Sequence, residues 1–541
     1  MTTTAAAPPE HTTTPSAKRV WSAAVAGLVA TAVALGSAEL LAGLVPPVPS
    51  LLLAIGDGVV DLGAGSRAKD IAIALFGTGE KTALLIGTVV LALLFGAGLG
   101  VVSRRRSLAW GAAGITAFGA LGLLATTVSP LASTSWAVMA AAVAVGTGVW
   151  TLRSLLSLDL RIQTAAEAVA AGRGTAASAE RVGRGRREFL RVAVGLTAVA
   201  GVAGYFGRTL LGRTETSAAR AAVVLPPTVT SLGPTSGSPG GAAFASIDGL
   251  SPLFTPNDDF YRIDTALMPP VVDVAAWSMR VHGMVDQEVV LTYDDLLDLP
   301  QFEADVTIAC VSNEVGGDLI GNARWQGVRL ADVLEMAGVD PQATQIVGRS
   351  VDGWTAGFPT EIAFDGRDAM IAVAMNGEPL PIPHGFPARL IVPGLYGYVS
   401  ATKWLSDLEL TTWEAFDGYW IPRGWSKEGP IKTQSRIDVP RQNADVAAGE
   451  VAVAGVAWAQ QRGLERVEVS IDEGAWQEAE LAEELNPDTW RQWRLRWDAE
   501  PGEHQIRVRA TDRDGFTQSE DRVPVAPNGA EGYHTRVVRV A

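Results

Sequence analysis

Five apolar stretches in the first 212 residues constrain the fold of this chain most strongly. They lie near residues 20–45, 82–102, 107–129, 135–156 and 192–212. Each is long enough, or nearly so, to cross a bilayer as a helix, which takes roughly 20 residues. A further apolar piece at 50–64 is interrupted by Asp57, Asp61 and several glycines, so we expect an external loop or an interfacial helix there. The pattern predicts an α-helical membrane bundle of about five spans within residues 1–212.

Basic residues between these stretches predict the orientation of the bundle. Lys18 and Arg19 precede the first stretch, Arg104–Arg106 separate the second from the third, and a basic segment from Arg153 to Arg191 separates the fourth from the fifth. Clusters of Lys and Arg stay on the cytoplasmic side of a membrane. We therefore expect a multi-pass protein of the cell membrane, with the region after residue 212 on the extracytoplasmic side.

The fifth stretch begins with Arg186–Arg191 (RREFLR), which resembles an internal twin-arginine export signal. The alternative is that these arginines are one more cytoplasmic cluster. An export signal of this kind suits a domain that must acquire a large cofactor before it crosses the membrane folded. None of the five stretches contains a histidine, and the chain has no CxxCH motif. We therefore predict no haem in this chain.

Charge divides the chain in two. Residues 1–217 carry 18 Lys and Arg against 11 Asp and Glu, a net charge of +7, whereas the remainder carries 25 against 47, a net charge of −22. An acidic second half argues against nucleic acid as a partner, because phosphate binding needs clustered positive charge. The single cysteine excludes an internal disulfide, and no zinc-ligand spacing is present.

The second half predicts two folded domains after a linker. Residues 213–256 are rich in Ala, Pro, Ser, Thr and Gly, as linkers are. Residues 257–432 mix strand-like runs with amphipathic helix candidates such as Leu330–Ala337, an α+β pattern. Residues 433–541 contain short alternating segments between turns, which is typical of an immunoglobulin-like β-sandwich. The predicted fold is thus multi-domain.

Cys310 stands where active-site groups often emerge, at the end of a strand-like run (ADVTIAC) and before a Gly-rich loop. A lone cysteine on a strand is more often a small buried apolar residue. The motifs found before and after Cys310 favour a functional role for this residue. The ordered motifs are Asn257–Arg262 (NDDFYR), Cys310–Asn313 (CVSN), Arg324–Leu330 (RWQGVRL), Met375–Pro381 (MNGEPLP), His384–Gly394 (HGFPARLIVPG) and Lys403–Leu405 (KWL).

This ordered series resembles the sulfite oxidase superfamily of molybdopterin enzymes, and residues 433–541 resemble its C-terminal dimerisation domain, which implies a homodimer. The resemblance implies a molybdenum cofactor with Cys310 as thiolate ligand and catalytic residue, and Tyr419 as a further catalytic residue lining the substrate pocket. The cofactor-binding residues it implies are Asp258, Tyr261, Arg262, Cys310, Ser350, His384, Arg389, Ser400, Thr402 and Lys403. A soft thiolate suits such a metal.

Three positions depart from the sulfite oxidase pattern. Glu314 and Val315 stand where sulfite oxidases have arginines after the cysteine, and Asp488 stands where another arginine is expected. Segments 258–261 and 396–403 resemble instead the methionine-sulfoxide reductase branch, which lacks the C-terminal sandwich. We expect two-electron oxygen-atom transfer on a small sulfur-containing substrate, with a separate cytochrome or quinone-linked electron partner. The alternatives are a methionine-sulfoxide-reductase-like enzyme and a cofactor-free membrane scaffold.

Overall fold

The computed structural model describes residues 17–45, 48–63, 80–127, 132–173, 176–211, 215–230, 232, 244 and 246–541. The chain divides into two compact units, residues 1–214 and 215–541. Part of the Pro- and Gly-rich stretch that suggested a linker, residues 233–243, lies outside the described residues.

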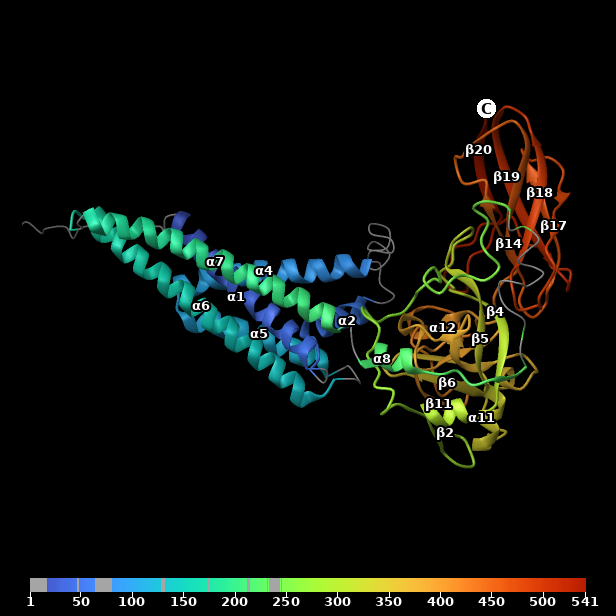
Figure 1. Ribbon diagram of the computed structural model, residues 1–541, viewed down its shortest axis with the longest axis horizontal. Coiled ribbons are helices and arrows are strands. Elements are labelled where there is room, and N and C mark those ends of the chain that lie inside the picture. The colour runs from blue at the N-terminus through green and yellow to red at the C-terminus, as the bar shows by residue number, and fades with distance from the viewer. Residues whose placement is uncertain are drawn as a thin grey trace, which may run out of the picture. The chain divides into compact units, whose positions relative to one another are not determined.

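The first unit is helical throughout its described part (Figure 1). Five of its helices are long and apolar enough to cross a membrane. The sixth, α2, has only 13 residues and fills the segment where we expected a loop or an interfacial helix. The helices are α1 (Ala17–Leu44), α2 (Leu51–Gly63), α4 (Glu80–Arg105), α5 (Leu108–Thr126), α6 (Thr134–Ala170) and α7 (Ala176–Leu211).

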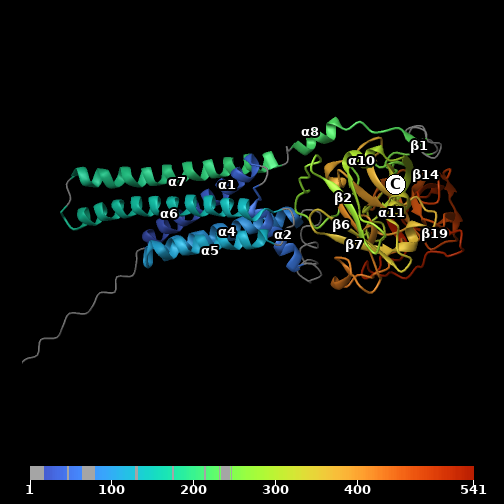
Figure 2. The ribbon, with the colours of Figure 1, turned by 90° about the horizontal axis from the view of Figure 1, so that it is seen from below.

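Helix α1 is the central element of this bundle, and α6 and α7 run alongside one another (Figure 2). In the most apolar 18-residue segment of α1, 50% of the residues are buried, against 17% in the corresponding segment of α4. Small residues allow this close approach: a Cβ atom on Gly36 would lie 2.4 Å from the carbonyl oxygen of Ala200, and one on Gly43 would lie 2.3 Å from that of Gly207. Small residues at helix contacts are the usual means of packing in membranes.

Part of the predicted linker is folded within the second unit. Residues 215–256 contain the helix α8 (Glu215–Ala222) and the strand β1 (Thr228–Thr230), which pairs with β4. The Thr216 hydroxyl donates to the carbonyl of Val272 at 2.9 Å, and Phe244 and Leu253 are buried. Composition suggested a linker because small and polar residues dominate it, but a few long-range contacts hold the segment in place.

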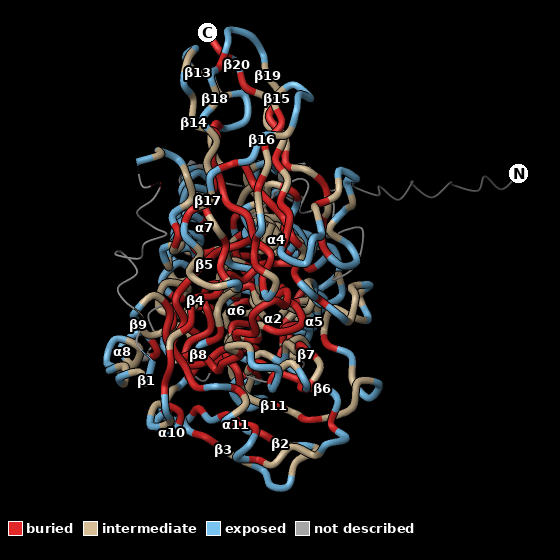
Figure 3. Tube along the Cα trace, turned by 90° about the vertical axis from the view of Figure 1, so that its right-hand side faces the viewer, coloured by how far each residue is buried: buried red, intermediate tan, exposed pale blue. Residues whose placement is uncertain are grey.

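Two mainly antiparallel sheets form the first half of the second unit. One has the order β1-β4-β5-β8-β10, with β9 paired to β8, and the other has the order β3-β2-β11-β6-β7. Nearly all residues within β4, β5 and β8 are buried (Figure 3), because these strands are covered on both faces. The strands of the first sheet are β4 (Gln301–Ala309), β5 (Ile320–Arg329), β8 (Met370–Met375), β9 (Glu378–Pro379) and β10 (Arg389–Ile391); those of the second are β2 (Ser278–Gly283), β3 (Val289–Thr292), β6 (Gln345–Ser350), β7 (Thr355–Pro359) and β11 (Leu405–Thr411).

Short helices connect these strands. The predicted helix at Leu330–Ala337 is confirmed as α11, whose Leu330, Val333, Leu334 and Ala337 are buried. It begins directly after β5 and ends at Gly338, which has a left-handed conformation (φ 68°) that favours glycine. The other helices are α10 (Tyr293–Asp298), α12 (Gly397–Ser400) and the 3-10 turns η3 (Thr360–Ala363), η4 (Ile382–His384) and η5 (Ile421–Arg423).

The C-terminal part is a β-sandwich of a four-stranded and a five-stranded sheet. Its described residues contain strands and no helix, which agrees with the short alternating segments of residues 433–541. A separate apolar core, including Trp493, Val467 and Val508, fills the space between the sheets. The strands are β12 (Gln434–Val439), β14 (Gly449–Trp458), β17 (Glu480–Leu481) and β18 (Arg491–Ala499) in one sheet, and β13 (Asp445–Val446), β15 (Leu464–Ile471), β16 (Gln477–Glu478), β19 (Gly502–Asp512) and β20 (His534–Val540) in the other.

The sandwich supports the loop between β4 and β5. Arg436 donates to the carbonyl of Gly317 at 2.8 Å, and the carbonyl of Asp488 accepts from the backbone N–H of Thr307 at 3.0 Å. A Cβ atom on Gly316 would lie 2.3 Å from the ring of His534. The loop that carries Cys310 therefore packs against residues of the sandwich as well as against its own sheet.

Candidate functional site

Cys310 directly follows β4 and is 8% exposed. Its backbone N–H donates to the carbonyl of Leu319 at 2.9 Å, and its carbonyl accepts from Asn313 at 3.0 Å, which closes a tight turn. The backbone N–H of Ser312 lies 3.4 Å from Cys310 Sγ and donates to it. Because an N–H directed at sulfur stabilises a negative charge there, the turn favours a thiolate.

A partly open cavity lies beside Cys310. Six of the ten residues implied as cofactor contacts line it: Tyr261, Cys310, Ser350, His384, Arg389 and Lys403. These residues come from separate segments between residues 261 and 403, and the fold brings them to one place.

Arg389 opens β10 and is 4% exposed. It donates to the carbonyl of His384 at 3.0 Å, and its guanidinium lies 5.1 Å from the ring centre of Trp325. Within the described part of the chain no carboxylate pairs with it, and its Nε atom has no hydrogen-bond partner. Burial lowers its pKa to about 10, so it remains charged at neutral pH. A buried, unneutralised guanidinium that lines a cavity is a site for an anionic group.

Lys403 supplies a second cation to the cavity. It pairs with Asp264, an acidic residue that was not predicted from the sequence. Its ammonium donates to Asp264 Oδ2 at 2.9 Å and to the carbonyl of Pro383 at 3.3 Å. Arg262 contacts the same carboxylate at 2.8 Å. Burial lowers the pKa of Lys403 to about 8, although Asp264 opposes this shift. Asp264 lies two residues after the recognised NDDFYR motif, and nothing in its local sequence marks it.

The pKa of Lys403 predicts how the stability of the cofactor-free protein depends on pH. Because the folded chain releases this proton near pH 8 and the unfolded chain near 10.5, the unfolded chain holds more protons between these values. Stability should therefore rise across this window, by up to about 3 kcal/mol. Urea unfolding followed by tryptophan fluorescence, at pH 8 and pH 10.5, measures this rise. Lys403→Met should remove the rise, and an unchanged rise in that variant would contradict the assignment.

His384 ends the turn η4 and is 6% exposed. Burial, followed by the charge of Arg389, lowers its pKa to about 4, so the imidazole is neutral at pH 7. Its Nε2 lies 3.1 Å from the carbonyl oxygen of Asn257. A carbonyl can only accept, so Nε2 carries the proton and Nδ1 is an acceptor. Burial, followed by the charge of Cys310, raises the pKa of Tyr261, so its hydroxyl keeps its proton.

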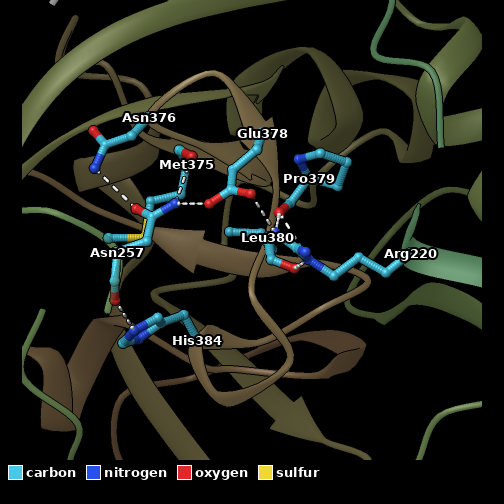
Figure 4. A network of polar contacts seen from close by, with 8 residues as sticks. All are labelled: Arg220, Asn257, Met375, Asn376, Glu378, Pro379, Leu380 and His384. Atoms are coloured by element: carbon cyan, nitrogen blue, oxygen red, sulfur yellow. Dashed lines mark hydrogen bonds and ion pairs between the residues drawn. The ribbon is translucent and has the colours of Figure 1, made fainter. Parts of the chain in front are cut away.

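A network of side chains fixes Asn257 and hence the carbonyl that accepts from His384 (Figure 4). The amide of Asn257 donates to the carbonyl of Met375 at 3.2 Å and to Glu378. The second oxygen of Glu378 accepts from Arg220 of α8 at 2.9 Å. Arg220 also donates to the carbonyl of Leu380 at 2.8 Å. The segment expected to be a linker therefore helps to hold a residue of the cavity.

Glu378→Gln should loosen this support at little cost to the fold. Glu378 is half exposed, so loss of its ion pair with Arg220 should lower the free energy of unfolding by less than about 1 kcal/mol. Outer contacts of this kind affect a bound group more strongly, and we expect about a 10-fold loss of cofactor retention. Asp368→Asn, which breaks an exposed 2.9 Å pair with Arg329, is the matched control. Equal cofactor retention in both variants would contradict the prediction.

Four implied contacts lie outside the lining of the cavity. Asp258 is exposed, and Arg262 pairs with Asp264. Ser400 is buried and donates to the carbonyl of Tyr396 at 3.1 Å, whereas Thr402 lies 3.4 Å from the carbonyl of Gly348. Tyr419 also lies outside the lining, but the ring of Trp420, 5.1 Å from its own, is part of it.

Aromatic residues that were not among the implied cofactor contacts form much of the remaining wall: Trp354, Tyr398, Trp404, Trp420 and Trp425. The rings of Tyr398 and Trp425 are 5.9 Å apart, and those of Trp420 and Trp425 are 6.4 Å apart. Asp264 and Asp352 add carboxylates to the wall. Among the described residues, the only arginine or lysine side chains in this wall are Arg389 and Lys403. Glu314 is exposed, and neither it nor Val315 lines the cavity.

Comparisons with known proteins agree with this geometry. The family described as oxidoreductase molybdopterin binding domain matches residues 266–420, and the family described as Mo-co oxidoreductase dimerisation domain matches residues 429–528. Human mitochondrial sulfite oxidase is 32% identical over 318 residues, which cover 50% of this chain and 58% of the human protein. The chain thus spans little more than half of that relative.

Two further relatives are matched over more of their length. Sulfite oxidase of Arabidopsis thaliana is 30% identical over 284 residues, 43% of this chain and 72% of the plant protein. The uncharacterised oxidoreductase YuiH of Bacillus subtilis is 35% identical over 170 residues, 31% of this chain and 82% of YuiH. Among solved structures, the sulfane dehydrogenase SoxCD of Paracoccus pantotrophus aligns with a TM-score of 0.47 at 23% identity, over 59% of this chain and 90% of that one.

Proposed function

This chain belongs to the sulfite oxidase superfamily of molybdopterin oxidoreductases, and on that basis we propose that it is a membrane-anchored, extracytoplasmic enzyme of two-electron oxygen-atom transfer. The observation that carries the proposal is the cavity that contains Cys310, neutral His384 and the unneutralised Arg389. The five apolar helices and the basic segments between them support the anchor and its orientation.

The residues of this cavity fit a molybdenum cofactor. Cys310 would bind the metal through a thiolate favoured by the N–H of Ser312. Arg389 and Lys403 would bind the anionic end of the pterin, and His384 would offer Nδ1 as an acceptor to its polar edge. When bound, the cofactor supplies the two-electron redox chemistry and the exchange of an oxygen atom.

The wall of the cavity favours a neutral substrate over sulfite. Sulfite is an anion and needs cations beside the metal. Arg389 and Lys403 are assigned to the cofactor, and the rest of the wall consists of aromatic, aliphatic and small polar residues with the carboxylates of Asp264 and Asp352. This arrangement supports the second candidate function, reduction of a neutral sulfoxide. In that reaction the sulfoxide takes up two electrons and two protons and leaves as a sulfide and water.

Elemental analysis and substrate comparison test the proposal together. We expect about one molybdenum atom per chain in protein from a host that makes the cofactor. With reduced methyl viologen as donor, a neutral methyl aryl sulfoxide should be reduced faster than sulfite is oxidised with ferricyanide. Preferred oxidation of sulfite would contradict the substrate assignment. Metal-free protein from such a host would favour the alternative of a membrane scaffold.

The proposal also includes partners. The match to a dimerisation domain over residues 429–528 supports a homodimer. Two-electron chemistry requires an electron donor or acceptor, for which a cytochrome or a quinone-linked protein is suitable. The net charge of −22 beyond residue 217 argues against nucleic acid.

A further inference from the structure

The loop between β4 and β5 is closed at its base by its own hydrogen bonds. Cys310 and Leu319 pair through the backbone where the two strands meet the loop, and the N–H of Leu319 donates to Asn313 Oδ1 at 2.9 Å. Asn313 is 6% exposed and Val315 is 7% exposed, so the loop packs against the protein. These contacts fix the part of the loop that lies next to Cys310.

Residues of the sandwich hold the tip of the same loop, Gly316 and Gly317. Arg436 of β12 donates to the carbonyl of Gly317 at 2.8 Å, and the ring of His534 of β20 occupies the space beside Gly316. Nδ1 of this ring accepts from the backbone N–H of Ile437 at 2.9 Å, which fixes the ring against β12. Gly316 has a φ of 79°, a conformation that favours glycine. The tip therefore fits against the sandwich at a position that has no room for a side chain.

The side chain of Arg436 joins three segments of the chain. It is 10% exposed, and its Nε donates to Asp438 Oδ1 of the same strand at 2.7 Å. Its Nη2 donates to the hydroxyl of Ser251 at 2.8 Å, and its Nη1 donates to the carbonyl of Gly317. Each nitrogen of the guanidinium thus has its own acceptor, which the planar fork of arginine allows and a single ammonium group does not.

A short path of chain connects the tip of the loop to Cys310. The N–H of Gly317 donates to the carbonyl of Glu314 at 2.8 Å, so the tip is itself a closed turn. Gly317 precedes Leu319 by two residues, and the carbonyl of Leu319 accepts from the N–H of Cys310 at 2.9 Å. Movement of the tip away from the sandwich would therefore displace the residue that is paired with Cys310.

We propose that Arg436 is a positioning residue for Cys310. By holding Gly317 against the sandwich, it keeps the turn after Cys310 closed and the N–H of Ser312 directed at the cysteine sulfur. The sandwich then completes the site, in addition to its resemblance to a dimerisation domain. This inference rests on the proposed function, because the geometry of the turn matters to the enzyme through Cys310 as the metal ligand.

The test uses Cys310 as the probe, because it is the one cysteine of the chain. Cofactor-free, full-length protein is treated with iodoacetamide at a fixed pH, and alkylation is followed by intact mass. Cys310 is 8% exposed, so we expect slow alkylation of the wild type, limited by opening of the loop. Arg436→Gln should raise the rate at least about 10-fold, because the charged hydrogen bond that holds the tip is lost.

Arg462→Gln is the matched control. Arg462 also donates to a carboxylate, a carbonyl and a hydroxyl, namely those of Asp512 at 3.0 Å, Ile431 at 3.1 Å and Thr433 at 3.1 Å. Urea unfolding should show that both variants fold, but the alkylation rate of the control should equal that of the wild type. In protein that has bound the cofactor, the visible absorption spectrum should differ from wild type in Arg436→Gln and not in Arg462→Gln.

Gly316→Ala disturbs the same contact from the side of the loop. Its added Cβ atom would lie 2.3 Å from the ring of His534, so it should also raise the alkylation rate, and it decides the question if Arg436→Gln does not fold. Wild-type rates in both loop variants would overturn the proposal. A rise in Arg462→Gln equal to that in Arg436→Gln would also overturn it, because the effect would then be a general loosening of the fold.

The alkylation assay does not depend on molybdenum. Metal-free wild-type protein from a host that makes the cofactor would count against the proposed function, whatever the alkylation rates are. Unchanged alkylation of Arg436→Gln, in a protein whose wild type binds molybdenum, would count against the role of Arg436 alone.

Discussion

Replacing Cys310 with serine is expected to reduce sulfoxide turnover by more than about 100-fold, because outer contacts of a metal ligand alone are worth 10- to 100-fold. Cys310 is the one cysteine of the chain, so no second thiolate can take its place. A serine hydroxyl stays protonated where the thiol ionises, and its hard oxygen is a poorer ligand for a metal held by sulfur. The measurement is the initial rate per molybdenum atom, with metal content determined by mass spectrometry.

Ser312→Ala is the matched control for this variant. The hydrogen bond to the cysteine sulfur comes from the backbone N–H of Ser312, which alanine keeps. The control should therefore retain both molybdenum and most of the rate. If Cys310→Ser retained the wild-type rate and the wild-type absorption spectrum, the ligand assignment would be wrong. A loss of rate in both variants would assign the effect to the geometry of the turn.

The sequence predicts best those parts of the fold that local pattern determines. The bounds of α11 follow from apolar residues spaced three and four apart, and the strand-like run that ends at Cys310 predicts its place directly after β4. His384 and Arg389 were implied by the resemblance, and the structure brings them together through the hydrogen bond of Arg389 to the His384 carbonyl. The resemblance could not show that Arg389 has no carboxylate partner among the described residues, because the partners of a buried side chain depend on every surrounding segment.

Other residues of the site had no local signal. Asp264 and Trp425 lie in loops of unremarkable sequence, and only the tertiary fold places them in the cavity wall. Arg220 also had no local signal. It lies in a segment whose composition is typical of a linker, and only the tertiary fold brings it to Glu378. Asp258, which the resemblance implied as a cofactor contact, lies outside the lining of the cavity. It stands beside the recognised Tyr261 but is exposed, because neighbours in an irregular segment need not point the same way.

Arg389→Met should change the stability of the protein in opposite directions with and without the cofactor. In cofactor-free protein the buried guanidinium has no carboxylate partner among the described residues, so its replacement by an apolar side chain of similar length should stabilise the fold by about 1–4 kcal/mol. The same change removes charged hydrogen bonds to the bound cofactor. We expect at least about a 10-fold loss of cofactor retention, measured as molybdenum per chain after dialysis.

Arg324→Met is the contrasting variant, because Arg324 is equally buried but donates to Asp305 at 2.7 and 2.9 Å. Its loss leaves a buried carboxylate alone and should destabilise the cofactor-free protein by about 3–5 kcal/mol. Thermal unfolding of protein from a host that cannot make the cofactor compares the two variants directly. If Arg389→Met destabilised the fold as Arg324→Met does, Arg389 would be a structural residue. Stabilisation of the cofactor-free protein by Arg389→Met is expected only if the charge of Arg389 serves an anion that binds after folding.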